Sequence, residues 1–316
     1  MATPLKLFYA SDIHGSERCF LKFLSAAKYY RAQVLILGGD ITGKVVVPLV
    51  RHGSNYHTQF LGREWRVSAG RELKELEKAV RMNGCYPVRL TPEEHQRYLA
   101  DHQAREGLVA EVIRASLTHW LELAEERLAG SGIRCLINPG NDDDWYVDEV
   151  LQQSQYVENG DGQVLDLDED HQMITVGYSN RTPFNSPREL DEEKLGEQLM
   201  GLAARLARPE SAVFTIHVPP YRSGLDDAPQ LRDLKVVTRG GQPVMVPVGS
   251  TAVREAISAV GPLLALHGHV HESRGAKRIG RTLCINPGSE YSEGVLRGAV
   301  ISLGRDRIMG YQLVSA

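Results

Sequence analysis

Short apolar runs alternate with amphipathic segments along most of the chain. The first such unit contains an apolar run at residues 5–10, a polar turn, helical periodicity over 17–30 and a second apolar run at 34–37. This order predicts a β-strand, a helix and a second strand. By the same criteria, we predict helices at 190–207 and 251–260, and strands at 135–138, 173–176, 213–216, 263–266, 283–285, 298–303 and 308–314. The alternation is typical of a layered α/β domain, in which ligands bind beyond the carboxyl ends of the strands.

The stretch between the second and third predicted strands is far longer than an ordinary connection. Helical periodicity predicts one helix over 70–82, a second starting at Thr91-Pro92, where Thr is a good cap and Pro a good first residue, and a third ending near residue 129. We therefore expect a single domain over residues 1–316 with an inserted, mainly helical, cap-like segment at 45–131. The alternative is that these helices only extend the core.

Composition narrows the class of protein. Hydrophobic residues make up 42% and charged residues 24% of the chain, as in ordinary globular proteins. A net charge of −4 and an isoelectric point near 6.3 do not predict a nucleic-acid partner. The chain has no run of about 18 apolar residues, so the sequence does not predict a membrane span. The N-terminus shows no export signal, and four cysteines without C-x-x-C spacing indicate reduced thiols, so we expect a cytoplasmic protein.

Five short polar motifs lie at predicted strand ends. They are Asp12-Ile13-His14, Gly38-Gly39-Asp40, Gly140-Asn141-Asp142, His217 and Gly268-His269-Val270-His271. Carboxylate, amide and imidazole groups together suit Mn, Fe or Zn. In an extended strand, residues i and i+2 face the same side, so each D-x-H or H-x-H pair is expected to point into one site. Glycines in the motifs allow the backbone to approach a bound ion closely.

Taken in order, these motifs resemble the five signature blocks of the calcineurin-like metallophosphoesterases, over about residues 5–303 apart from the insert. The segments 217–221 and 286–289 resemble loops of the Icc-like bacterial and archaeal branch. The resemblance implies a four-layer α/β/β/α sandwich with a helical insert, two divalent ions, and attack on a phosphate ester by a hydroxide held between them. It further implies that Asp40 bridges the two ions. The implied ligands of the first ion are Asp12, His14 and His271, and those of the second are Asn141, His217 and His269.

The sequence departs from the family pattern at one place. Many members have histidine where this chain has Asp142, and that histidine resembles a proton donor to the leaving group. Three replacements remain open: Asp142 itself, His52 or His57 from the start of the insert, or a substrate whose good leaving group needs no strong acid. Two nearby cations would favour an ionised Asp142. We expect Asp143 and Asp144 to cap the following helix.

The predicted function is hydrolysis of a small phosphorylated substrate, with a phosphodiester or nucleotide favoured over a phosphomonoester. A non-catalytic metal-binding scaffold that uses the insert to bind a protein partner is the alternative from another class. A nuclease would need a basic groove, and the insert has no sustained basic run. The insert is expected to restrict access to the site or to form a homodimer interface.

Overall fold

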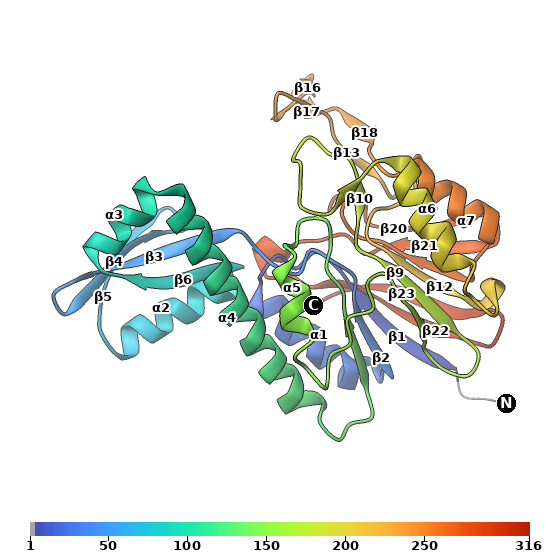
Figure 1. The fold of residues 1–316 in the computed structure, drawn as a ribbon, viewed down its shortest axis with the longest axis horizontal. Helices are drawn as coiled ribbons and strands as arrows, with labels where there is room; N and C mark the ends of the chain where they lie inside the picture. The colour runs from blue at the N-terminus through green and yellow to red at the C-terminus, as the bar shows by residue number, and fades with distance from the viewer. Residues whose placement is uncertain (1–3) are drawn as a thin grey trace.

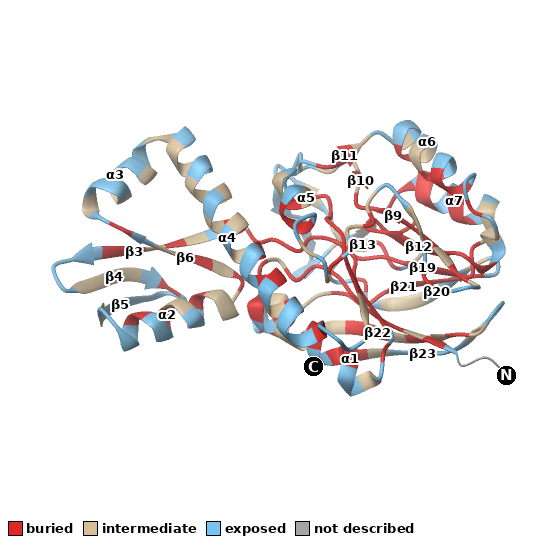
Figure 2. Ribbon diagram, turned by 60° about the horizontal axis from the view of Figure 1, so that its bottom comes forward, coloured by how far each residue is buried: buried red, intermediate tan, exposed pale blue. Residues whose placement is uncertain are grey.

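Alternate residues of the first strand face two different cores. Leu7 and Tyr9 of β1 (Leu5–Ala10) lie in an apolar cluster between two sheets, whereas Phe8 and Ala10 pack beneath helices. Successive side chains of a strand point to opposite faces, so a strand buried on both sides is apolar throughout. The computed structural model describes residues 4–316. Figure 2 shows the buried residues at the centre of the body.

Two sheets form the body (Figure 1). The first has the order β23 (Ile308–Ser315), β22 (Arg297–Leu303), β1, β2 (Val34–Leu37) and β7 (Arg134–Ile137). The second has the order β20 (Gly275–Ile279), β21 (Thr282–Asn286), β19 (Leu264–Leu266), β12 (Val213–Ile216), β9 (Gln172–Val176) and β8 (Val164–Asp166). Every strand predicted from an apolar run is present, and the added strands β8 and β20 lie at the edges of the second sheet.

Helices cover both outer faces. Those packed on the first sheet are α1 (Glu17–Tyr30), α4 (His102–Leu128) and α5 (Tyr146–Leu151). Those on the second are α6 (Glu192–Ala203) and α7 (Thr251–Val260). The expected four-layer α/β/β/α sandwich is therefore confirmed. Helix α6 is shorter than its apolar pattern predicts, and the following residues lead into a short 3-10 helix, η1 (Pro209–Ser211). A second one, η2 (Tyr291–Glu293), precedes β22.

The segment at 45–131 contains the three predicted helices, with α2 (Arg71–Met82) and α3 (Pro92–Ala100) preceding α4. Thr91 caps α3 in a reciprocal pair with Glu94, as the Thr-Pro start predicts. The segment also contains strands that the sequence analysis does not foresee. They form a sheet in the order β5 (Arg63–Ser68), β4 (Asn55–Phe60), β3 (Val45–His52) and β6 (Cys85–Leu90). Strands β4 and β5 are polar and largely exposed, so no continuous apolar run marks them, whereas β3 has an apolar run at residues 45–50 that Pro48 interrupts.

The insert projects from the body and has a small apolar core of its own (Figure 1). Leu49 of β3, Phe60 of β4 and Leu76 of α2 belong to that core. Helix α4 connects the two parts, because its buried Trp120 stacks on Phe20 of α1 with ring centroids 4.3 Å apart. The insert is thus anchored to the first sheet's helical layer.

A second projection, residues 227–247, is a set of short antiparallel pairs. Its strands are β13 (Asp227–Pro229) with β18 (Met245–Pro247), β14 (Leu231–Arg232) with β15 (Lys235–Val236), and β16 (Thr238–Arg239) with β17 (Gln242–Pro243). The outermost turn is at Gly240-Gly241, between the paired strands β16 and β17. We call this projection the hairpin arm. Facing it, β10 (Ser179–Asn180) and β11 (Glu189–Leu190) bracket a loop at 181–188.

Among residues 4–316, no helix combines the length and apolar character that crossing a bilayer requires. All four cysteines are free thiols, and three of them are buried. Burial raises the pKa of Cys135 and of Cys284, in the latter case to about 12, so these thiols act as small core residues.

Candidate metal centre

Loops from both sheets meet at one edge of the sandwich. The parallel strands β1, β2 and β7 of the first sheet and β12 and β19 of the second all end there. Each of the five sequence motifs follows one of these strands. The structure brings all seven predicted metal ligands into this one place: Asp12, His14, Asp40, Asn141, His217, His269 and His271.

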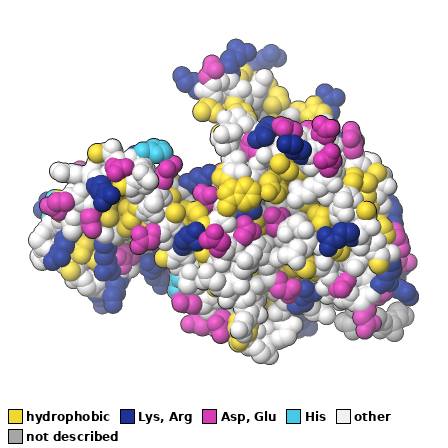
Figure 3. Space-filling view, viewed as in Figure 1, with side chains coloured by type: hydrophobic (Ala, Val, Ile, Leu, Met, Phe, Trp, Pro, Cys, Tyr) yellow, Lys and Arg dark blue, Asp and Glu magenta, His cyan; other side chains and the backbone are white. Residues whose placement is uncertain are grey.

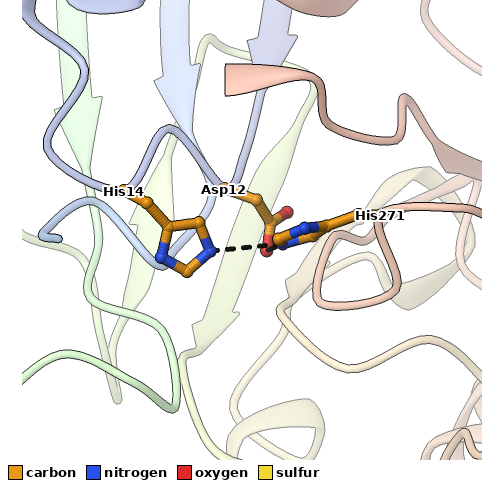
Figure 4. A group of neighbouring side chains, drawn as sticks. All are labelled: Asp12, His14 and His271. Atoms are coloured by element: carbon orange, nitrogen blue, oxygen red, sulfur yellow. Dashed lines mark hydrogen bonds and ion pairs between the residues drawn. The ribbon is translucent and has the colours of Figure 1, made fainter. Parts of the chain in front are cut away.

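Asp12, His14 and His271 form a first group, in which the candidate ligand atoms all lie within 4.8 Å of one another (Figure 4). The Nε2 atoms of His14 and His271 are 3.2 Å apart, and Nε2 of His271 is 3.5 Å from Oδ1 of Asp12. The backbone N–H of His269 donates to both carboxylate oxygens of Asp12, at 2.9 and 3.1 Å. These bonds orient the Asp12 carboxylate toward the two imidazoles.

Asp40, His217 and His269 form a second group of the same compactness. Nε2 of His217 is 3.3 Å from Oδ2 of Asp40, and Nδ1 of His269 is 2.7 Å from Oδ1 of Asn141. The same Oδ2 of Asp40 lies 3.8 Å from Nε2 of His14, which belongs to the first group. Asp40 therefore lies between the two groups.

The buried Nε2 of His217 makes no hydrogen bond, although it faces carboxylate oxygens of Asp40 at 3.3 Å and of Asp12 at 3.8 Å. The other ring nitrogen, Nδ1, is 3.2 Å from the carbonyl oxygen of Gly38. A carbonyl only accepts, so a neutral imidazole carries its proton on Nδ1 and directs the Nε2 lone pair toward the carboxylates. A lone pair facing two carboxylates is unfavourable unless Nε2 also takes up a proton or a metal cation lies between them. The residues present therefore fit a divalent metal ion.

The charges of the buried side chains also favour a bound cation. Burial raises the pKa of Asp40, but the adjacent His217 outweighs burial and holds that pKa well below its usual range. Burial lowers the pKa of His217, but Asp40 and Asp12 together raise it to about 9. The two buried carboxylates thus require positive charge beside them, which a divalent cation supplies more fully than a single imidazolium.

Four of the seven residues have left-handed backbone conformations. The φ angles are +56° at Asp12, +39° at His14, +47° at Asp40 and +66° at His269. Such conformations cost about 1–3 kcal/mol each in residues other than glycine and are typical of functional sites. The extended-strand spacing on which the prediction was based is therefore not the reason that Asp12 and His14 lie together. They lie beyond the end of β1, and a tight turn brings them together.

The H-x-H pair also behaves differently from that expectation. His271 joins Asp12 and His14 in the first group, whereas His269 joins Asp40 and His217 in the second. The two histidines therefore lie in one site but in different ligand groups, which is the division that the family resemblance implies. The strand β19 ends at Leu266, before either of them, so strand alternation does not set their directions.

Glycine is required at the contact between the loops. A Cβ atom at Gly140 would overlap the backbone and carboxylate of Asp40, and one at Gly268 would overlap Ser11 and the Asp12 carboxylate. These overlaps involve backbone and buried ligands that cannot move aside. At both positions glycine lets two loops approach each other closely, and the predicted approach of the backbone to a bound ion stays a prediction.

The expectation that Asp143 caps the following helix is wrong. Its buried carboxylate instead accepts hydrogen bonds from the loop after β2, including the backbone N–H groups of Ile41 and Thr42. Helix α5 has no side-chain cap, and the carboxylate of Asp144 accepts only from the neighbouring N–H of Trp145, at 3.1 Å. Asp143 therefore joins the loops that carry Asp40 and Asn141.

Sequence reasoning also missed two cationic residues. Arg188 is 2% exposed, and its guanidinium donates to the backbone carbonyl of Asp143 at 2.9 Å and pairs with Asp148. Lys44 pairs with the carboxylate of Asp142, which also accepts from Ser186 at 3.1 Å. A lysine four residues after the predicted bridging Asp40 was the available signal for Lys44, and nothing in the sequence distinguished Arg188 from other arginines.

The structure places the three candidate proton donors in two different regions. Asp142 lies at the site, because its N–H donates to Oδ1 of Asp40 at 2.9 Å, and its carboxylate pairs with Lys44. His52 and His57 lie on the insert sheet, with ring centroids 4.6 Å apart. His52 ends β3, seven residues after Val45, or roughly 23 Å at the rise of an extended strand. The structure does not bring His52 or His57 to the seven predicted metal ligands.

Comparisons with known proteins bear on the fold. No protein-family model matches the chain. The protein MJ1162 of Methanocaldococcus jannaschii, described as uncharacterized, is 29% identical over 182 residues, which are 56% of this chain and 75% of that protein. The solved structure of TT1561 of Thermus thermophilus is 14% identical, covers 99% of both chains and gives a TM-score of 0.55. A structure of a novel archaeal phosphodiesterase is 8% identical, covers 98% of this chain and 99% of that one, and gives a TM-score of 0.37, which is too low to support an argument. The likeness to TT1561 shows a shared fold.

Proposed function

We propose that this chain is a metal-dependent phosphoesterase of the calcineurin-like metallophosphoesterase family, which binds two divalent ions and hydrolyses a small phosphodiester. The observation that carries the proposal is the position of Asp40, whose Oδ2 lies within 4 Å of imidazole nitrogens from both ligand groups. One carboxylate between two such groups is the arrangement that a pair of ions sharing a ligand requires.

The ligand sets follow from the two groups. Asp12, His14 and His271 would hold one ion, and Asn141, His217 and His269 the other, with Asp40 shared. Mixed oxygen and nitrogen ligands favour Mn, Fe or Zn over Mg or Ca. Two such ions, when bound, activate water as a nucleophile and neutralise charge on the phosphoryl oxygens.

The chain supplies further groups at the rim of the site. The Lys44 side chain is 55% exposed, which leaves its ammonium accessible to a ligand while it pairs with Asp142. A cation there can stabilise negative charge on a phosphoryl oxygen or on the leaving group. The tight turns at Asp12, Asp40 and His269 hold the ligands in place before a substrate binds, so little reorganisation is needed.

The test is hydrolysis by metal-stripped protein that is reloaded with Mn²⁺, Zn²⁺ or Mg²⁺. Bis(p-nitrophenyl) phosphate and p-nitrophenyl phosphate serve as the diester and the monoester. Asp40→Asn removes the shared carboxylate, and Asp306→Asn, in an exposed turn between β22 and β23, is the matched control. Bound metal is counted in each variant by elemental analysis.

We expect turnover that depends on added metal, falls at least 100-fold in Asp40→Asn and is unchanged in Asp306→Asn. Faster cleavage of the diester would support a phosphodiesterase, and faster cleavage of the monoester a phosphomonoesterase. Two bound ions without turnover of either ester would support the scaffold alternative. A wild-type protein that binds no metal would contradict the proposal altogether.

A further inference from the structure

A cavity of about 720 Å³ opens beside the metal centre, and His269 and His271 form part of its wall. The rest of the wall comes from the loop at 181–188 and from the hairpin arm. Volumes of this size accept drug-sized ligands. A phosphodiester whose phosphorus lies at the metal centre would therefore place one of its two ester groups in this cavity.

Most of the side chains in the wall are apolar. Phe184 and Tyr221 are aromatic, and Leu231, Val236 and Val246 on the hairpin arm are aliphatic. Several prolines extend the same carbon-rich surface. A wall of this kind favours a carbon-rich ligand, because burying apolar surface is its main source of binding energy.

Some polar groups in the wall are already paired, whereas the buried Oδ1 of Asn180 makes no hydrogen bond to any described residue. The Nε–H of Arg181 donates to Asp191 at 3.0 Å, and the hydroxyl of Thr182 donates to Glu189. Glu272 adds a carboxylate near the metal-centre end of the cavity. A second phosphate group would be repelled by this carboxylate, and the mainly apolar wall offers a sugar or base few hydrogen-bonding groups beyond Asn180, Gln230 and Tyr221.

Several apolar side chains around the cavity are unusually exposed. Phe184 is 67% exposed, Val236 48% and Met245 46%. Figure 3 shows hydrophobic side chains at the root of the hairpin arm, with Lys and Arg at its tip. Exposed apolar groups that gather at the mouth of a cavity indicate a ligand-binding surface.

We infer that this cavity binds an apolar ester group, an alkyl chain or simple aryl group, of the phosphodiester substrate. The inference rests on the proposed function, because the metal centre fixes where the phosphoryl group lies. Substrate choice would then depend on the 181–188 loop and the hairpin arm, which together form the apolar wall, and not on the insert.

Binding of methyl-, butyl- and octylphosphonate tests this inference, since their C–P bond is not hydrolysed and affinity is read by calorimetry without turnover. Each fully buried methylene strengthens binding about fourfold. We expect octylphosphonate to bind at least tenfold more tightly than butylphosphonate. Phe184→Ser should reduce that ratio at least threefold, whereas Phe184→Leu should largely retain it. Met309→Ser removes an apolar side chain of similar exposure on β23, away from the cavity, and should leave the ratio unchanged.

Equal affinity for the three phosphonates, or a nucleoside phosphonate that binds more tightly than octylphosphonate with no effect of Phe184→Ser, would overturn the inference. Failure of the proposed function has a different signature, which is metal-loaded protein that cleaves neither nitrophenyl ester. The dependence of affinity on the length of the alkyl chain is also measured with metal-free protein, where only the apolar contribution to binding remains. The two hypotheses can thus fail independently.

Discussion

Thr42 donates two hydrogen bonds to the same oxygen of Asp143, from its backbone N–H at 2.8 Å and from its hydroxyl at 2.6 Å. The other carboxylate oxygen accepts from the N–H groups of Ile41, at 3.0 Å, and Gly140, at 2.8 Å. Burial and the nearby Asp40 raise the pKa of Asp143, against the effect of these hydrogen bonds. One buried side chain therefore joins the loops on which Asp40 and Asn141 are carried.

Asp143→Ala should lower the free energy of unfolding by about 3 kcal/mol or more, because it leaves several buried donors without an acceptor. Asp143→Asn, which keeps one carbonyl oxygen, should cost less. Denaturant unfolding monitored by circular dichroism measures both, with the exposed Asp306→Ala as control. A loss in Asp143→Ala no larger than in Asp306→Ala would contradict the role assigned to Asp143.

Metal loading should stabilise the fold, because a cation relieves the repulsion between Asp12 and Asp40. A ligand at 100 times its dissociation constant adds about 2.7 kcal/mol, which corresponds to a rise in Tm of roughly 4 °C for a chain of this size. Asp40→Asn should lose most of this rise, and Asp306→Asn should keep it. Thermal unfolding with Mn²⁺ and with a chelator provides the measurement. An equal rise in both variants would show that Mn²⁺ binds elsewhere.

His52→Ala and His57→Ala should leave kcat and KM within about twofold of wild type, since both side chains lie on the insert sheet, away from the metal cluster. Steady-state hydrolysis of the nitrophenyl esters is sufficient. A tenfold or larger fall in kcat in either variant would instead mean that the insert closes over the site during catalysis.

Lys44→Ala should lower kcat/KM about 10- to 100-fold, the range expected for losing a charge-assisted hydrogen bond to a phosphoryl oxygen or leaving group. Lys44→Arg should recover part of the loss. If Lys44 assists the leaving group, the loss should be larger for a phenyl ester than for a p-nitrophenyl ester, because phenolate is the poorer leaving group. Lys74→Ala, exposed on α2, is the control. Equal activity of Lys44→Ala and Lys74→Ala would remove Lys44 from the mechanism.

Asp161 should make stability depend on pH in weakly acidic solution. Burial raises the pKa of Asp161 to about 6, from 3.8, and Arg188, at 3.7 Å, only partly offsets this. The folded state therefore holds the proton more tightly than the unfolded state. Its stabilising contribution is present below pH 3.8 and is lost as the pH rises to about 6, by at most about 3 kcal/mol.

Asp161→Asn should remove that dependence. Urea denaturation at several pH values from 4 to 7 measures the unfolding free energy of wild type and of Asp161→Asn. As the pH rises, the unfolding free energy of wild type should fall relative to that of Asp161→Asn. A difference that stays constant over this range would show that Asp161 has an ordinary pKa.

Local pattern was sufficient for the framework of the fold. The apolar runs predicted every strand of the two sheets except the edge strands β8 and β20. For the central strands the reason is that a strand buried on both faces must be apolar throughout, whereas β23 was predicted although most of it is exposed. Two of the insert strands were missed for the converse reason. β4 and β5 expose most of their side chains at least in part, and their polar sequence resembles a loop.

The sequence by itself determined which residues gather at the metal centre, since each motif follows a parallel strand and such strands end at a common edge of their sheet. Motif spacing alone left open how they divide, which only the family resemblance implied. The tertiary structure groups them in that way, with Asp40 between the groups and His269 and His271 on different sides. It also decided which other charges reach the site, bringing Lys44 to Asp142 and leaving His52 and His57 on the insert. The physical reason is that left-handed turns and packing between distant loops set these directions, and neither is encoded in the spacing of residues along one strand.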